Sequence, residues 1–171
     1  MIRFTENAVT RIRRASQNVA FAALALSLTT PAAGARDNWA LDPATKCRFV
    51  TPKSLGASNV HWIGACPDGK ASGLGLLLRR GAAKAGPAFY GALRDGVPWI
   101  GVVEDNGFRA GRVVAGEIGS GEVAPQERMD AFTTAAKAAR AVSAHYAGHR
   151  NSASAQYYVE VAKRLEMQID I

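Results

Sequence analysis

The sequence predicts an α+β protein, in which an antiparallel meander of β-hairpins is followed by two C-terminal helices. Two observations predict this order. Fifteen of the 17 glycines lie between Gly56 and Gly121, where short apolar runs alternate with turn residues. After Pro125 glycine nearly disappears and alanine, the strongest helix former, takes its place. The chain therefore divides into a strand-forming half and a helix-forming half.

The strand-forming half contains apolar runs that are too short and irregular to be helices. They are bounded by glycines and by Asp-Gly pairs, which accept the positive φ angles of tight hairpin turns. The strongest turn signals are Asp68-Gly69 and Asp95-Gly96. The expected strands are Cys47–Val50, Val60–Ala65, Leu74–Leu78, Ala88–Leu93, Trp99–Val103 and Arg112–Ala115.

The helix-forming half predicts one helix from Pro125 to a cap at Gly148, and a second from Asn151 or Ser152 to about Gln168. Proline suits the first helical turn, and both Asn151 and Ser152 are N-cap candidates. Apolar residues recur on one face of each helix, and we expect both faces to be core. The faces are Met129, Phe132, Ala136, Ala139, Val142 and Tyr146, and then Tyr158, Val161, Ala162, Leu165 and Ile169.

Residues 1–35 have the order of a secretory signal peptide. Arginines come first, an apolar run from Val19 to Leu28 follows, and Ala33-Gly34-Ala35 forms an A-x-A cleavage pattern. A buried helix at the start of a cytosolic fold is the alternative, which Pro31 and the alanines fit less well. We therefore expect cleavage after Ala35 and a periplasmic or secreted protein.

The expected mature chain divides into a β-meander at 36–122 and a helical pair, packed on or beside the sheet, at 123–171. The leader carries four arginines and one glutamate, so its removal lowers the formal net charge from +7 to +4. This mildly basic charge favours anionic surfaces and falls short of a nucleic-acid footprint. No transmembrane span is expected in the mature chain.

Cys47 and Cys66 are the only cysteines. Two cysteines in an oxidising compartment most often pair, and closing this loop contributes about 3 kcal/mol to stability. The alternatives are a nucleophilic thiol assisted by His61 and a redox pair, but neither has the expected motif or spacing. We expect a disulfide bond.

A spacing recurs within the β-meander. Pairs of glycines lie five residues apart, an aromatic residue precedes each pair, and the first unit continues into Gly-x-Gly. These repeat residues are Trp62, Gly64, Gly69, Gly73, Gly75, Tyr90, Gly91, Gly96, Gly101, Phe108, Gly111 and Gly116. In this spacing the chain resembles the MORN repeat family over about residues 61–121, with degenerate units. The resemblance implies a single-layer sheet of stacked hairpins, used for scaffolding or for association with proteins and lipids. The C-terminal helices are the expected cover for one face of such a sheet.

Motifs for catalysis and cofactors are absent or incomplete. Gly64–Ala71 matches the glycine and lysine of a phosphate-binding loop, but alanine stands where the magnesium-binding Ser or Thr belongs. His145 and His149 have a metal-ligand spacing at the expected end of a helix, without the glutamate of zinc hydrolases. Glu104 and Asp105 are adjacent and are expected to point to opposite faces of a strand. We assign no catalytic residue, metal or cofactor.

The remaining candidate site is a basic loop that contains Arg79, Arg80 and Lys84 and would bind an anionic surface. The leading hypothesis is an exported binding or scaffold protein of the cell envelope. Its partner would be a protein or an anionic component, either lipid headgroups or cell-wall polymer. Two alternatives stay open: a small envelope hydrolase whose site no motif reveals, and a structural protein that self-associates through its helices.

Overall fold

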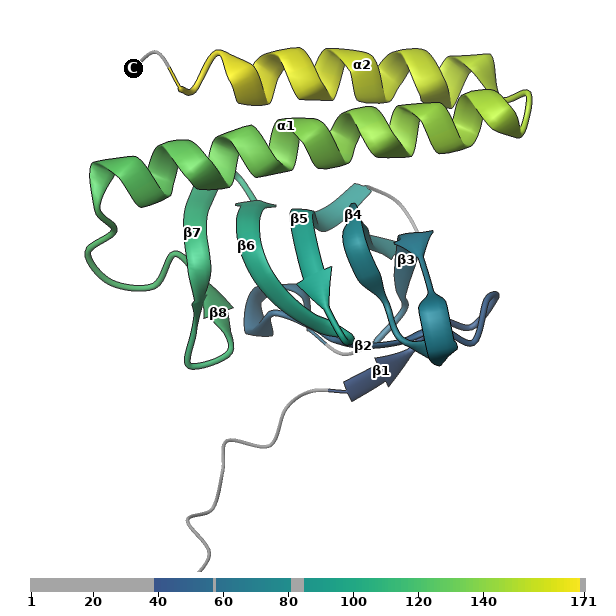
Figure 1. Cartoon of the computed structure of the whole chain (residues 1–171), viewed down its shortest axis with the longest axis horizontal. Coiled ribbons are helices and arrows are strands. Elements are labelled where there is room, and N and C mark those ends of the chain that lie inside the picture. The colour runs from purple at the N-terminus through teal and green to yellow at the C-terminus, as the bar shows by residue number, and fades with distance from the viewer. Residues whose placement is uncertain (1–38, 57, 81–84, 170–171) are drawn as a thin grey trace, which may run out of the picture. The chain divides into compact units, whose positions relative to one another are not determined.

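The computed structural model describes residues 39–56, 58–80 and 85–169 (Figure 1). The signal peptide expected at residues 1–35, and Lys84 of the expected basic loop, lie outside these residues. The described strands and helices are β1 (Trp39–Leu41), β2 (Arg48–Val50), β3 (Val60–Ala65), β4 (Ser72–Arg80), β5 (Ala85–Arg94), β6 (Val97–Glu104), β7 (Phe108–Val114), β8 (Glu117–Ile118), α1 (Pro125–Gly148) and α2 (Ser152–Glu166).

Six of the described strands form one sheet in the order β3-β4-β5-β6-β7-β8, so each strand pairs antiparallel with the next along the chain. The strands β1 and β2 form a separate antiparallel pair. The helices α1 and α2 follow all the strands. The predicted fold class, an α+β protein with a β-hairpin meander and two C-terminal helices, is confirmed.

The turn between β5 and β6 is the tight hairpin that its Asp-Gly pair favours. Asp95 and Gly96 have φ angles of 47° and 87°. Arg94 pairs with Val97 across them, so the loop holds only these two residues. Positive φ angles at both central positions match the right-handed twist of the flanking strands.

The turn between β3 and β4 is longer than a two-residue hairpin. Asp68 and Gly69 have positive φ angles there, but they belong to a short 3-10 turn, Pro67–Gly69. Pairing between the two strands stops at Ala65, and the short turn then begins at Pro67, which has no N–H to donate to a partner strand.

The helices cover one face of the sheet, as expected. α1 lies across the face and contacts β3 to β7, and α2 packs against α1 (Figure 1). The side chain of Asn151 accepts a hydrogen bond from the N–H of Ser154 at 3.0 Å, so it is the N-cap of α2. Most buried residues of α1 are alanines, whose small side chains let the helix pack closely against both the sheet and α2. Met129 of the expected apolar face is an exception, with 42% of its surface exposed.

The opposite face of the sheet is covered by the N-terminal segment, residues 39–56, which the sequence did not predict as a cover. Phe49 and Leu55 of this segment are fully buried in one apolar cluster with Trp62, Leu77 and Phe89 of the sheet. The sheet is therefore enclosed between helices on one side and an irregular segment on the other. Without this segment a face of large apolar side chains would be open to water.

Backbone hydrogen bonds and a disulfide hold the N-terminal segment in place. The N–H of Val50 donates to the oxygen of Gly96 at 2.7 Å, and the N–H of Ala71 donates to the oxygen of Arg48 at 2.9 Å. The strand β2 thus lies against the ends of two hairpins. Cys47 and Cys66 form the predicted disulfide, with their Cα atoms 6.0 Å apart.

Candidate functional site

The repeating glycines form a row across the sheet. Gly64 pairs with Gly75, and the row continues through Gly91 and Gly101 to Gly111, each on the next strand from β3 to β7. Because each strand pairs with its successor, the first glycine of each five-residue pair lies in this row together with Gly75 and Gly101, whereas the second glycine of each pair lies in a turn. Because glycine has no side chain, the row forms a groove on the face of the sheet that the N-terminal segment covers.

Two aromatic rings fill this groove. A Cβ atom at Gly64 or at Gly75 would overlap the ring of Trp62, and a Cβ atom at Gly91 would overlap the ring of Phe89. In a strand, residues two apart share a face, so an aromatic residue placed two before a glycine lies over it. The aromatic-x-Gly spacing therefore serves packing, and these residues are not available to a ligand.

The other repeat residues also have structural places. Gly69, Gly96 and Gly116 lie in turns with φ angles of 72°, 87° and 80°. Gly73 has a φ angle of 79° near the start of β4, next to an irregularity in the pairing with β3. On the helix side, Tyr90 is buried and Phe108 makes an edge contact with Phe132 of α1.

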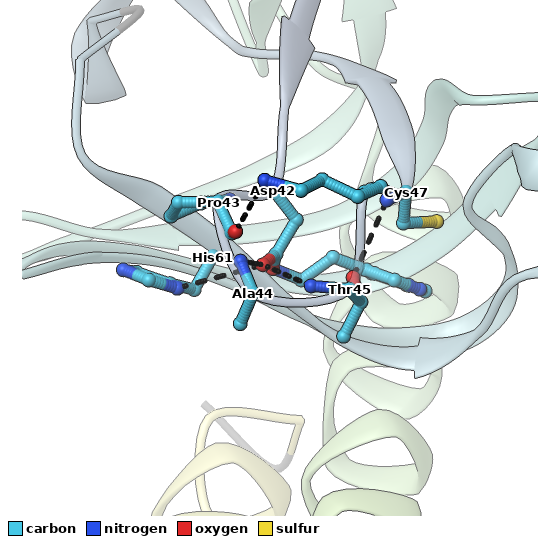
Figure 2. A network of polar contacts seen from close by, with 8 residues as sticks. Asp42, Pro43, Ala44, Thr45, Cys47 and His61 are labelled. Atoms are coloured by element: carbon cyan, nitrogen blue, oxygen red, sulfur yellow. Dashed lines mark hydrogen bonds and ion pairs between the residues drawn. The ribbon is translucent and has the colours of Figure 1, made fainter.

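Asp42 is a buried carboxylate that fastens the N-terminal segment to the edge strand β3, as Figure 2 shows. Its Oδ1 accepts from the N–H groups of Ala44 at 2.8 Å and Thr45 at 3.1 Å, and its Oδ2 accepts from the N–H of Trp62 at 2.7 Å. Burial raises the pKa of Asp42, but these three N–H groups and then His61 more than offset it, so the pKa lies below the ordinary 3.8.

His61 lies beside this carboxylate, with its Nδ1 3.7 Å from Oδ1 of Asp42 (Figure 2). An acid next to a histidine also occurs in nucleophilic sites, where a third residue attacks the substrate. The thiol that the sequence offered for that role is not free, because Cys47 and Cys66 are bonded to each other. Backbone N–H groups already occupy both oxygens of Asp42. The pair is best explained as a structural contact.

A partly open pocket of about 530 Å³ lies between α2 and the sheet, where β4 and β6 end and β5 begins. We call it the tyrosine pocket. Leu78, Pro87 and Ala88 contribute its apolar wall. Its polar lining among the described residues consists of Tyr90, Glu104, Asp105, Asn106, Tyr157 and Tyr158. Glu104 and Asp105 both line it, because β6 ends at the first and the chain turns at the second.

Packed aromatic rings hold the wall of the tyrosine pocket. The ring of Tyr158 is stacked on that of Tyr146, with centroids 5.5 Å apart, and makes an edge contact with Tyr90 at 6.4 Å. Tyr157 packs edge-on against Tyr158 at 5.0 Å and is 51% exposed. Burial, and next the charge of Glu104, raise the pKa of Tyr90, so its hydroxyl stays neutral at any physiological pH.

A second group of aromatic and charged residues surrounds the turn between β5 and β6, at the other end of the strands. The ring of Trp99 lies between two guanidinium groups, that of Arg94 at 3.9 Å and that of Arg112 at 4.8 Å from the ring centroid. Both arginines are exposed, and neither forms an ion pair with another described residue. Cation–π contact orients the two guanidiniums but leaves their charges uncompensated.

A second contact between an arginine and a tryptophan lies at the same turn, on the N-terminal segment. The ring of Trp39 lies over Gly96, where an added Cβ atom would come within 2.8 Å of it, and the guanidinium of Arg48 is 5.5 Å from the ring centroid. The strand β1, which carries Trp39, lies at the end of the sheet away from the helices (Figure 1). We call the whole group the hairpin-tip cluster: Trp39, Arg48, Arg94, Val97, Trp99 and Arg112.

The arginines of the expected basic loop do not come together. Arg79 pairs with Val60 and reaches toward Gly56 on the face that the N-terminal segment covers, with its Nη1 3.7 Å from the place of a Cβ there. Arg80 is the next residue in β4, and its charge acts on Tyr158 of α2. The two side chains therefore point to opposite faces and do not form one basic surface.

The two histidines with metal-ligand spacing lie at the end of α1. Their ring centroids are 4.3 Å apart, and Nδ1 of His149 is 2.8 Å from the backbone oxygen of His145. Burial, and next the charge of His149, lower the pKa of His145. Within the described ranges no group of three or more His, Cys, Asp or Glu residues is placed to hold a metal ion.

Sequence reasoning missed both the tyrosine pocket and the hairpin-tip cluster. For the cluster a signal existed: once Asp95-Gly96 is taken as a two-residue turn, Arg94 and Val97 must be neighbours at its base, with Trp99 following. For the pocket no signal existed, because it joins the end of β6 to a face of α2 about 50 residues further along the chain.

The fold and these two features define an α+β protein with an acidic aromatic pocket and a basic aromatic surface. Comparisons of the chain with protein-family models, with curated proteins and with solved structures found no match. Among the described residues, no helix has the length and apolar character needed to cross a membrane.

Proposed function

We propose that this protein is exported to the cell envelope and binds anionic lipid surfaces with its hairpin-tip cluster. The main support for this proposal is the contact of the Trp99 ring with the guanidinium groups of Arg94 and Arg112. Neither guanidinium forms an ion pair with a carboxylate among the described residues. Uncompensated guanidiniums are attracted to the negative potential of anionic lipids, at about 1 kcal/mol for each charge near the surface. The sequence of residues 1–35 and the disulfide support export.

Exposed apolar side chains next to the arginines favour lipid over a hydrated polymer or an acidic protein. Trp39, Leu41 and Val97 are 41%, 52% and 37% exposed. Trp39 and Leu41 share one face of β1, because they are two residues apart. Tryptophan prefers the boundary between headgroups and acyl chains, and apolar area inserted there adds to the electrostatic attraction. A sugar polymer would leave Leu41 and Val97 in water.

The MORN-like interpretation is part of this proposal. The row of glycines under Trp62 and Phe89 gives a packing reason for the aromatic-x-Gly spacing on which the resemblance rests. In that family stacked hairpins associate with proteins and lipids, which agrees with a lipid surface as the partner. The proposal differs from the sequence-based expectation in its residues, since the hairpin-tip cluster replaces the loop at 79–84.

The test is co-sedimentation with vesicles of phosphatidylcholine alone or mixed with phosphatidylglycerol. We expect binding only to the mixed vesicles, and the double variant Arg94→Gln/Arg112→Gln to bind roughly 30-fold more weakly, since two charges near the surface contribute about 2 kcal/mol. The matched control is Lys137→Gln/Arg150→Gln, which removes the same charge from exposed positions on the helical half. An equal loss of vesicle binding in the two double variants would mean that the net charge of the protein, and not this cluster, attracts the lipid.

A small hydrolase is the second candidate, because Glu104 and Asp105 line one pocket. Two carboxylates are the minimum for general acid and base catalysis, although the described lining has no histidine, serine, cysteine or lysine to act with them. Turnover of a chromogenic glycoside, ester or phosphate by the purified protein, abolished by Glu104→Gln, would favour this candidate over a binding protein.

A further inference from the structure

We propose that the tyrosine pocket is a binding site for a small organic cation, held through an ammonium group. The site lies at the opposite end of the strands from the hairpin-tip cluster and involves none of its residues. It is therefore independent of lipid binding, and either proposal can fail alone.

The first observation is a tyrosine hydroxyl in the pocket that has no protein partner among the described residues. Tyr90 is 3% exposed and lines the pocket, and its hydroxyl has no hydrogen bond to another described residue. Every polar side-chain atom that is sealed from solvent in the described part of the chain has a partner. The Tyr90 oxygen must therefore open onto the pocket, where a ligand or water completes its hydrogen bonding. An apolar ligand group placed against this hydroxyl would leave it unpaired at a cost of about 1–3 kcal/mol, so the position selects for a polar ligand.

The second observation is the charge of the lining. Glu104 and Asp105 both line the pocket, and no lysine, arginine or histidine lines it among the described residues, although the charges of Arg164 and Arg80 act on Tyr90 and Tyr158 from beside it. The ion pair of Glu104 with Arg164 of α2 spans 3.4 Å between partly exposed side chains, so it is weak and leaves the carboxylate able to accept further hydrogen bonds. In a chain with a formal net charge of +7, the charged residues in the described lining of this pocket are both acidic.

The third observation is the set of aromatic faces. Tyr157 and Tyr158 bring their rings to the same wall, and the stacking of Tyr158 on Tyr146 fixes the orientation of that wall. The face of a tyrosine ring attracts a cation within about 6 Å of its centroid, and this attraction grows as the cation loses water. Carboxylates, a neutral phenol and ring faces together recognise an ammonium that donates hydrogen bonds. A neutral alcohol of the same size would gain only a hydrogen bond with the phenol hydroxyl.

The test compares two probes of the same size, butylamine and 1-butanol, by following the tyrosine ring resonances of the full chain in NMR titrations. We expect butylamine to shift the resonances of Tyr90 and Tyr158 in a saturable way and 1-butanol not to. Butylamine affinity should fall roughly tenfold in Glu104→Gln, which keeps the shape and removes the charge, and roughly fivefold in Tyr90→Phe, which removes only the hydroxyl.

The control variant is Glu122→Gln, an exposed carboxylate outside the pocket, which should bind butylamine as the parent does. Equal binding of the alcohol and the amine would overturn the proposal, because charge would then play no part. The same holds if neither probe shifts the tyrosines, or if Glu104→Gln leaves butylamine affinity unchanged while circular dichroism shows the parent fold.

Discussion

Replacing Gly91 with alanine is expected to destabilise the protein by at least about 3 kcal/mol, the upper end for an overpacked core. The added Cβ atom would overlap the carbonyl oxygen of Ile100 and the ring of Phe89, and would lie 2.9 Å from the Cα atom of Gly101. Phe89 is fully buried, and the other two groups are backbone of the adjacent strand. None can give way without separating β5 from β6. Urea unfolding followed by circular dichroism measures the loss.

The matched control for this change is Gly148→Ala. Gly148 is the last residue of α1, and nothing lies within 4 Å of the place where its Cβ would be. Alanine is the better helix former by up to about 1 kcal/mol, so the control should be as stable as the parent or slightly more stable. If Gly91→Ala were as stable as Gly148→Ala, the glycine row would not be a packing requirement, and the explanation of the repeat spacing would be wrong.

The elements of the fold were predictable because their signals are local. Asp95 and Gly96 are themselves residues that accept the positive φ angles of their turn. Asn151 caps α2 by accepting a hydrogen bond from Ser154, only three positions away. The disulfide was predictable from the cysteine count and the expected export alone. These features need no knowledge of what packs on what.

The features that escaped prediction depend on long-range contacts. Residues 39–56 carry little periodicity, and it is the structure that shows this segment covering the sheet, with Cys47, Phe49 and Leu55 buried against it. The expected basic loop shows the same limit: a cluster along the chain, such as Arg79 and Arg80, need not be a cluster in space. Candidate sites built from different elements become visible only when the elements are packed.

Asp42 shows most clearly how a single polar side chain can hold such a long-range contact. Replacing it with alanine is expected to cost about 3 kcal/mol, because one buried and two partly buried N–H groups would lose a charged acceptor at once. Two of these groups close the turn after β1, and the third belongs to Trp62 in the edge strand. The loss should therefore loosen the whole N-terminal cover. Asp130→Ala, which removes an exposed carboxylate on α1, is the control and should change stability by less than about 0.5 kcal/mol.

The same carboxylate makes stability depend on pH in a definite direction. The pKa of Asp42 in the folded protein is lower than its ordinary value of 3.8, so the unfolded chain takes up a proton first as the pH falls. The stabilisation by Asp42 is complete above about pH 5 and is lost below pH 4, as the pH falls through the folded-state pKa. The stability difference between the parent and Asp42→Asn should then not decrease from about pH 7 to pH 5, because the neighbouring His61 can only add positive charge as the pH falls, and it should shrink at lower pH. Urea unfolding of both proteins across this range measures it. A difference that stays constant down to about pH 2 would mean that the side chain is not held as a carboxylate, and that the N-terminal segment is fastened to β3 by other contacts.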